Sequence, residues 1–459
     1  MIKLLMLLYI WEGVAAKTFL YWKPGVYKLH MFASILLPAA LVVFHMNNTN
    51  ASRELASLQR DKTWGRVWGY VLFIAGWGGI GAVLSPPVVL NVVYSVTFGL
   101  MFAVCWLVAP SLVRKVGWHK SLDWAFAPLY GCVVVSFLMC MASGFSLTRV
   151  HGVFYTSAQA AWSASLCALA AYYRTMTSRG MKRNIFLGCL ACSAGLTILT
   201  RTRGHILAMM AGLVVMWALC ATTPQERTTR RGQAIAAFVV VGFLAMFYGE
   251  SKQAGKTMEY LRIREGETTG VLDTRTTCWK LGWDSICESP VVGQGWLSKW
   301  AGQSGGESAA QTGRSYSFTD DPHNLYLTVG KSVGFPGLVA ILTIMVALNL
   351  KAFRMFQTCR HFGATPEQGL FMALVGWTLA ASLISNPLIS FGATTDRYTW
   401  AMLGTYLAMC AWHQSRKPQG IPPTMLNKLA MLKMKARQQR PPHKPQPEPT
   451  ATTQAETEP

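Results

Sequence analysis

The stretch that decides the fold is residues 66–109, RVWGYVLFIAGWGGIGAVLSPPVVLNVVYSVTFGLMFAVCWLVA, in which no charged residue follows Arg66. It holds two apolar runs, 66–84 and 88–109, separated only by Ser-Pro-Pro at 85–87. Each run has about the 20 residues that a helix needs to cross a hydrocarbon core roughly 30 Å thick. The stretch therefore predicts two membrane-spanning helices joined by a tight turn.

The composition extends this prediction to the whole chain. Of its 459 residues, 52% are hydrophobic and 14% are charged, with a mean hydropathy of +0.28. Soluble domains carry about 25% charged residues, so a soluble globular enzyme is excluded, and so is a disordered or fibrous protein. Apolar runs occur at 2–20, 28–46, 66–84, 88–109, 123–143, 150–173, 185–200, 204–222, 233–249, 335–353, 367–385 and 398–414. We expect an all-α polytopic membrane protein with about 12 transmembrane helices, in which Glu12 and Lys17 of the first run need partners.

Basic residues gather in every second connection between these runs. They lie at 53–62, 114–120, 174–183, 227–231, 351–360 and from 416 onward. Cytoplasmic loops of membrane proteins accumulate Lys and Arg, so both termini are expected in the cytoplasm. The same rule accounts for the net charge of +22 without a nucleic-acid partner.

One connection is far longer than the others. Residues 250–334 form a polar stretch on the non-cytoplasmic side, with patterns at 257–264 and 274–286 that predict short amphipathic helices. We therefore divide the chain into four parts. They are transmembrane helices 1–9 in 1–249, a periplasmic loop in 250–334, transmembrane helices 10–12 in 335–414, and a basic, partly disordered cytoplasmic tail in 415–459.

Most of the 11 cysteines fall in apolar runs, where they are expected to be small core residues instead of metal ligands. Cys278 and Cys287 share the long loop and could form a disulfide if that loop faces an oxidising compartment.

Three polar motifs are candidates for function. The first is Thr200-Arg201-Thr202-Arg203-Gly204-His205, a tight turn on the outer side. Two arginines there oppose the usual charge bias, so an anionic partner would explain them. Alternatively, both arginines extend to the interface or pair with acidic residues of the long loop.

The second motif begins at Asp273 and contains Arg275 and Trp279. Arg275 alone would be an ordinary charge on a helix surface. Gly293-Gln294-Gly295 follows it, without the strand and helix that a nucleotide-binding fingerprint requires. A plain turn is therefore the favoured interpretation of the Gly-x-Gly.

The third motif, Asp320-Asp321-Pro322-His323-Asn324-Leu325-Tyr326, closes the long loop. Histidine suits proton transfer near neutral pH, which makes His323 a candidate general base. The alternative is structural, with Asp321 capping a helix whose first turn contains His323. A metal site on this histidine and the two aspartates is a third alternative, which lacks further spaced ligands.

Together, these motifs and the topology resemble the bacterial O-antigen ligase family, part of a wider group with O-antigen polymerases and pilin oligosaccharyltransferases. The resemblance rests on an Arg-Gly at an outer turn, an Arg-x-x-x-Trp early in the long loop and a His-Asn-x-Tyr near its end. It implies a GT-C-like membrane glycosyltransferase that works without metal or other cofactors. His323 would be the catalytic residue and Arg203 and Arg275 the diphosphate-binding residues. The supporting residues would be Arg201, Asn324, Tyr326 and Asp321.

The resemblance further implies the reaction and its place. The donor would be O-antigen on undecaprenyl diphosphate, and the acceptor a sugar hydroxyl of lipid A–core. The enzyme would lie in the bacterial inner membrane among its lipids, with the active site on the periplasmic side. The alternatives are an O-antigen polymerase, a protein O-oligosaccharyltransferase or, from a different class, a polysaccharide or lipid transporter. Transporters usually carry ionisable residues at the membrane midplane, whereas the conspicuous residues here cluster at one face.

Overall fold

The computed structural model describes the chain in segments, and all statements below refer to them. The described residues are 2–15, 18, 24–47, 51–59, 61–84, 88–143, 151–154, 156–200, 202–220, 225–226, 228–230, 232–233, 271–296, 324–383, 385, 388 and 394–415. The chain divides into two compact units, Met1–Trp412 and His413–Pro459. The helices lie in the first unit, except for the last residues of α17.

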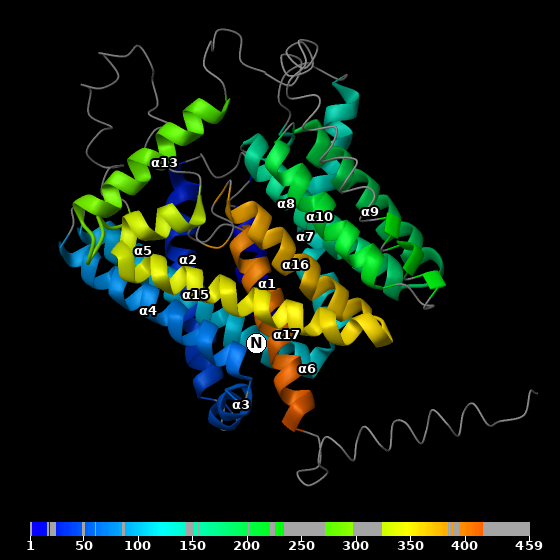
Figure 1. Cartoon of the computed structure of the whole chain (residues 1–459), viewed down its shortest axis with the longest axis horizontal. Coiled ribbons are helices and arrows are strands. Elements are labelled where there is room, and N and C mark those ends of the chain that lie inside the picture. The colour runs from blue at the N-terminus through cyan, green and yellow to red at the C-terminus, as the bar shows by residue number, and fades with distance from the viewer. Residues whose placement is uncertain are drawn as a thin grey trace, which may run out of the picture. The chain divides into compact units, whose positions relative to one another are not determined.

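Apart from one isolated bridge between Thr18 and Phe154, the regular structure in the described segments is helical (Figure 1). The elements are α1 (Ile2–Ala15), α2 (Pro24–Met46), α3 (Ala51–Leu58), α4 (Lys62–Leu84), α5 (Val88–Ala103), the π-helix η2 (Val104–Val108), α6 (Ala109–Val116), α7 (Trp118–Ala142), α8 (Ser157–Thr177), α9 (Gly180–Leu199), α10 (Arg203–Leu219), α13 (Val271–Glu288), α15 (Leu325–Phe362), α16 (Pro366–Ser382) and α17 (Thr394–Ser415). Helices thus occupy at least part of eleven of the twelve apolar runs, and the run at 233–249 lies outside the described residues except for residue 233.

Four of these helical segments are long and apolar enough to cross a membrane. They are Lys62–Leu84, Asn91–Val116, Trp118–Ala142 and Leu325–Cys359. Phe32–Met46 and Gly204–Leu219 are shorter apolar helices. The protein is therefore helical and polytopic, as its sequence predicts.

The acidic residue in the first apolar run has a buried partner. Glu12 Oε2 lies 2.7 Å from Nη1 of Arg397, whose side chain is 1% exposed. The guanidinium carbon of Arg397 also lies 4.0 Å from the ring centroid of Tyr9. This ion pair joins the first helix to the last, which confirms the expectation for Glu12. Lys17 lies outside the described residues.

The long helix α15 is broken near its start. Gly334 has φ 78° and ψ −171°, a conformation that residues with a Cβ rarely adopt, and Pro336 follows it. A short helix, 325–333, therefore precedes the apolar segment that begins at Phe335. This break coincides with the end of the loop expected at 250–334, although the helix itself starts inside that range.

Gly334→Ala should lower the free energy of unfolding by about 2 kcal/mol, because alanine is strained at this φ. Its Cβ would also lie 2.6 Å from the Pro290 carbonyl oxygen. Gly376→Ala is the matched control: it lies inside α16 with open space around it, and should be neutral or slightly stabilising. Chemical unfolding in detergent micelles measures both. Equal effects would contradict a special role for Gly334.

The two cysteines of the long loop cannot form a disulfide with each other. Cys278 and Cys287 both lie in α13, nine positions apart. At 1.5 Å per residue their Cα atoms are separated by about 13 Å, well beyond the roughly 7 Å limit for a bridge. The structure thus rules out the pairing that their shared loop allowed, and confirms the helix expected at 274–286.

Candidate functional site

The candidate site is built around the start of α15. Asn324 is the N-cap: its side-chain oxygen accepts hydrogen bonds from the backbone N–H groups of Tyr326, at 3.0 Å, and Leu327, at 3.2 Å. Asn324 Nδ2 donates to the carbonyl oxygen of Leu383, at 3.3 Å, just beyond α16. Asn324 thereby attaches the start of α15 to the end of α16.

This cap corrects one interpretation of the sequence. The alternative to catalysis placed Asp321 at the cap and His323 in the first helical turn. The helix instead begins after Asn324, because that side chain satisfies the backbone N–H groups of Tyr326 and Leu327 in the first turn. The cap thus lies one residue after His323, which itself is outside the described residues.

The Gly-x-Gly after α13 is a helix-capping turn. The backbone N–H groups of Gln294 and Gly295 donate to the carbonyl oxygens of Lys331, at 2.8 Å, and Ser332, at 3.1 Å. These carbonyls end the short helix and would otherwise lack partners. Both glycines have positive φ, 72° at Gly293 and 78° at Gly295. The turn predicted for this motif is confirmed, and it fixes α13 to the break in α15.

The same segment is held by the membrane helices. Trp296 is buried, and its Nε1 donates to Ser95 Oγ of α5 at 2.8 Å. A Cβ on Gly78 of α4 would lie 3.0 Å from the same nitrogen, and one on Gly81 would collide with the Val292 carbonyl oxygen. Small residues on α4 therefore let the loop backbone approach closely.

Helices α10 and α16 pair in antiparallel fashion. The Ala364 N–H donates to the Leu219 carbonyl at 3.2 Å, and a Cβ on Gly212 would lie 3.4 Å from the Ala373 carbonyl. If the same register continues to the other end of α10 and α16, Arg203 lies level with Ser382. The start of α10 thus lies at the end of α16 to which Asn324 is bonded.

Helix α13 lies beside the short helix of α15 and runs in the same direction. Ile286 approaches Gly330 so closely that an added Cβ would lie 2.6 Å from Ile286 Cδ1. Further along, the Phe335 N–H donates to the Pro290 carbonyl at 2.7 Å. The first half of α13, which contains Arg275, consequently extends toward the Asn324 end of α15.

The structure gives backbone positions for two predicted site residues and side chains for two others. Arg203 begins α10 and Arg275 lies in α13. Arg201, Asp321 and His323, with the side chains of Arg203 and Arg275, lie outside the described part of the chain, so their mutual contacts remain predictions. Asn324 is a buried cap, and Tyr326 packs half-buried against the hydrophobic core.

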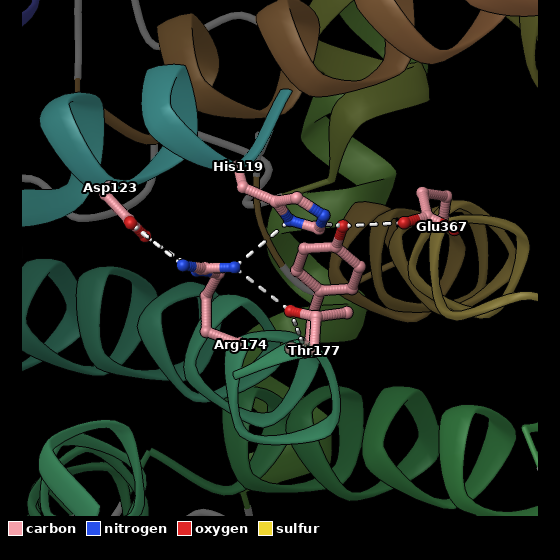
Figure 2. Close-up of polar contacts among 6 residues, drawn as sticks. His119, Asp123, Arg174, Thr177 and Glu367 are labelled. Atoms are coloured by element: carbon pink, nitrogen blue, oxygen red, sulfur yellow. Dashed lines mark hydrogen bonds and ion pairs between the residues drawn. The ribbon is translucent and has the colours of Figure 1, made fainter. Parts of the chain in front are cut away.

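A second polar cluster, which the sequence did not predict, joins α7, α8 and α16 (Figure 2). Arg174, whose side chain is 7% exposed, binds both carboxylate oxygens of Asp123, at 2.6 and 2.9 Å. Its Nη1 lies 3.1 Å from His119 Nδ1, so that nitrogen accepts the hydrogen bond. Tyr173 donates to Glu367 Oε1 at 2.9 Å. We call these five residues the Arg174 cluster.

The Arg174 cluster is remote from the candidate site. At the other end of α8, Trp162 packs against His205 of α10, with ring centroids 5.5 Å apart. Twelve residues of helix, about 18 Å, separate Trp162 from Arg174. The contacts of the cluster join α7, α8 and α16, so it is best explained as a set of polar contacts that holds these three helices together. In the sequence, the only sign of this cluster is Asp123, an aspartate at the edge of the apolar run 123–143.

Asp123→Asn should lower the free energy of unfolding by about 1–3 kcal/mol, because a buried guanidinium loses its bidentate acceptor. Glu226→Gln is the matched control, since it weakens an i,i+4 pair whose arginine, Arg230, is 27% exposed instead of buried, and it should cost no more than about 0.5 kcal/mol. Unfolding in detergent micelles measures both. If the two variants were equally stable, the Arg174 cluster would not support the bundle.

Comparisons with known proteins bear on the same region. In a search of curated proteins, no match was found. Among solved structures, the chain is similar to one from "Structural coordination of polymerization and crosslinking by a peptidoglycan synthase complex". The identity is 15% and the TM-score 0.43, and the alignment covers 78% of this chain and 98% of that chain.

A family model described as O-antigen ligase matches residues 188–342. This range includes Arg203, Arg275 and His323. Members of the family are glycosyltransferase-like ligases and polymerases that use polysaccharide and lipid-linked substrates. In this region, about a third of the chain, the protein is similar to the O-antigen ligase family.

Proposed function

We propose that the protein is an O-antigen ligase. It transfers O-antigen polysaccharide from undecaprenyl diphosphate to a sugar hydroxyl of lipid A–core at the periplasmic face of the inner membrane. The observation that carries this proposal is the family match over 188–342, because that single range contains all three residues proposed to act on the substrates.

Arg203 and Arg275 bind the diphosphate in this proposal. Cleavage of the sugar–phosphate bond places growing negative charge on the leaving diphosphate. Fixed cations directed at that charge stabilise the transition state more than the ground state. Planar guanidinium groups bind two phosphate oxygens at once, which lets the reaction proceed without metal.

His323 acts as the general base. It accepts the proton of the attacking core hydroxyl while the hydroxyl oxygen bonds to the anomeric carbon of the donor sugar. The bond from that carbon to the diphosphate oxygen breaks, and undecaprenyl diphosphate leaves. A single displacement opposite the leaving group inverts the anomeric centre.

The arrangement of the helices supports a shared site for these residues. The antiparallel register brings the start of α10 to the end of α16, and Asn324 hydrogen-bonds the same end. The first half of α13 extends toward it as well. Arg203 begins α10, Arg275 lies in the first half of α13, and His323 directly precedes Asn324 in the sequence.

The proposed topology has twelve spans, cytoplasmic termini and a periplasmic loop at 250–334. In intact cells with a permeabilised outer membrane, a membrane-impermeant thiol reagent should modify Ser304→Cys and leave Gln419→Cys unmodified. Peptide mass spectrometry separates these sites from the native cysteines, and lysed cells control for intrinsic reactivity. The reverse pattern would contradict the orientation and every site assignment.

Deleting the gene in its own host tests the function. For a ligase, the lipopolysaccharide O-antigen ladder should disappear while long lipid-linked O-antigen accumulates on the periplasmic side. For a polymerase, lipopolysaccharide carrying single repeat units would remain. For a transporter, the lipid-linked material would accumulate on the cytoplasmic side. An unchanged ladder would contradict all three.

A further inference from the structure

Helix α15 carries an exposed apolar stripe. Its members recur every three or four positions and are 36–58% exposed: Phe335, Val339, Leu342, Val346, Leu350 and Phe353. They lie in the segment Leu325–Cys359, which is long and apolar enough to cross a membrane. A stripe of this kind on a membrane helix faces lipid.

The stripe is nearly as long as the hydrocarbon core of a bilayer is thick. From Phe335 to Phe353 is 18 residues, or about 27 Å along the helix, close to the roughly 30 Å of hydrocarbon in a membrane. Exposed Arg354 follows Phe353, and the nearby Lys351 Nζ pairs with Asp61 Oδ2 at 2.6 Å. With charges at the Phe353 end, Phe335 is placed at the outer boundary of the hydrocarbon.

The segment after Arg275 continues this lipid-facing surface beyond Phe335. Trp283 of α13 is 47% exposed, and its ring packs edge-on against Phe335 with centroids 5.8 Å apart. Val291 is 59% exposed, and its carbonyl oxygen accepts a hydrogen bond from Trp77 Nε1 of α4 at 2.9 Å. Trp77 in turn stacks on Phe73, an exposed residue of α4.

The faces of α13 match those of a helix lying in a membrane interface. Gly282, Ser285 and Ile286 are buried toward the protein. Exposed Leu281 and Trp283 flank this face on its two sides. The opposite face carries exposed Lys280, Asp284 and Glu288, at a spacing of four residues. Figure 1 shows α13 oriented across α4 and across the long part of α15 that follows Gly334, instead of along them.

We propose that the second half of α13 and Val291 are seated in the outer leaflet, at the boundary between headgroups and acyl chains. Trp283 and Val291 contact lipid there, and the Lys280–Glu288 face points to water. Tryptophan favours this depth, and interfacial helices bury one apolar side in this way. If the proposed function holds, this position in the membrane keeps Arg275, on the same helix, level with a lipid-linked diphosphate. The membrane position itself does not depend on that function.

Thiol labelling of the full-length protein in phosphatidylethanolamine–phosphatidylglycerol vesicles tests this position in the membrane. Trp283→Cys and Val291→Cys are compared with Asp284→Cys, which lies one residue away on the polar face. Each is treated under reducing conditions with a membrane-impermeant maleimide and with a lipid-soluble one, and labelling is read by peptide mass spectrometry. Native Cys287, exposed on the same helix, normalises for the orientation of the protein in each vesicle.

With the impermeant reagent, Asp284→Cys should react about as fast as Cys287. Trp283→Cys and Val291→Cys should react about tenfold more slowly, because an apolar boundary disfavours the reactive thiolate. The lipid-soluble reagent should reach both. Fast aqueous labelling of Val291→Cys would overturn the proposal even if Trp283→Cys failed to fold. Protection from both reagents would overturn it too, since protein would then cover the surface. If the protein gives this labelling pattern but catalyses no polysaccharide transfer, the result counts against the proposed function alone.

Discussion

His323→Ala should reduce polysaccharide transfer by about 10²–10⁴-fold, the usual contribution of a general base. Donor binding should persist, because Arg203 and Arg275 remain. His323→Gln should do no better, since an amide can hydrogen-bond the acceptor hydroxyl but cannot take its proton. Transfer rate and affinity for the lipid-linked donor, measured on the same purified variants, separate the two roles.

His151→Ala is the matched control, because the predicted topology puts this exposed histidine on the same side of the membrane, outside the family match. It should retain transfer. The wild-type rate should fall as pH drops through the imidazole range, because a protonated ring cannot act as a base. Rapid turnover by His323→Gln would make His323 an orienting residue, and lost donor binding would assign it to the diphosphate site.

Arg203→Lys and Arg275→Lys should each slow transfer about a hundredfold, which corresponds to roughly 3 kcal/mol of lost transition-state stabilisation. Lysine keeps the charge but loses the planar fork that binds two phosphate oxygens. The alanine variants should be only slightly worse. The measurement is the transfer rate at saturating acceptor as a function of donor concentration.

Arg183→Lys serves as the control for these two variants. Arg183 is exposed near the start of α9, on the side predicted to be cytoplasmic, and its substitution should leave the rate unchanged. Wild-type rates in Arg203→Lys and Arg275→Lys would show that a diffuse positive field suffices. Bidentate recognition would then be the wrong mechanism.

Much of the fold follows from local sequence patterns. Apolar runs predicted the positions of helices, because a bilayer sets the length and hydropathy of a span. The three-residue connection between α9 and α10 and the turn at Gly293-Gln294-Gly295 were also predicted, since arginine, glycine and threonine interrupt or close those runs. The order of motifs around Arg203, Arg275 and His323 indicated the family before any geometry.

Contacts between distant residues could not be predicted in this way. Nothing near Glu12 identifies Arg397 as its partner, and nothing near Asp123 identifies Arg174, because such pairs depend on which helices pack together. The cap of α15 was misplaced for a related reason. Asp321 and Asn324 are both good capping residues, and the bond from Asn324 to Leu383 of another helix favours the second.

The central claim is the transfer reaction itself. Purified protein should be mixed with lipid-linked O-antigen and lipopolysaccharide that lacks O-antigen, with EDTA present. The account predicts O-antigen–capped lipopolysaccharide and released undecaprenyl diphosphate in equal amounts, dependent on the acceptor and on His323. Longer lipid-linked chains formed without the acceptor, or no product from protein that binds the donor, would contradict it.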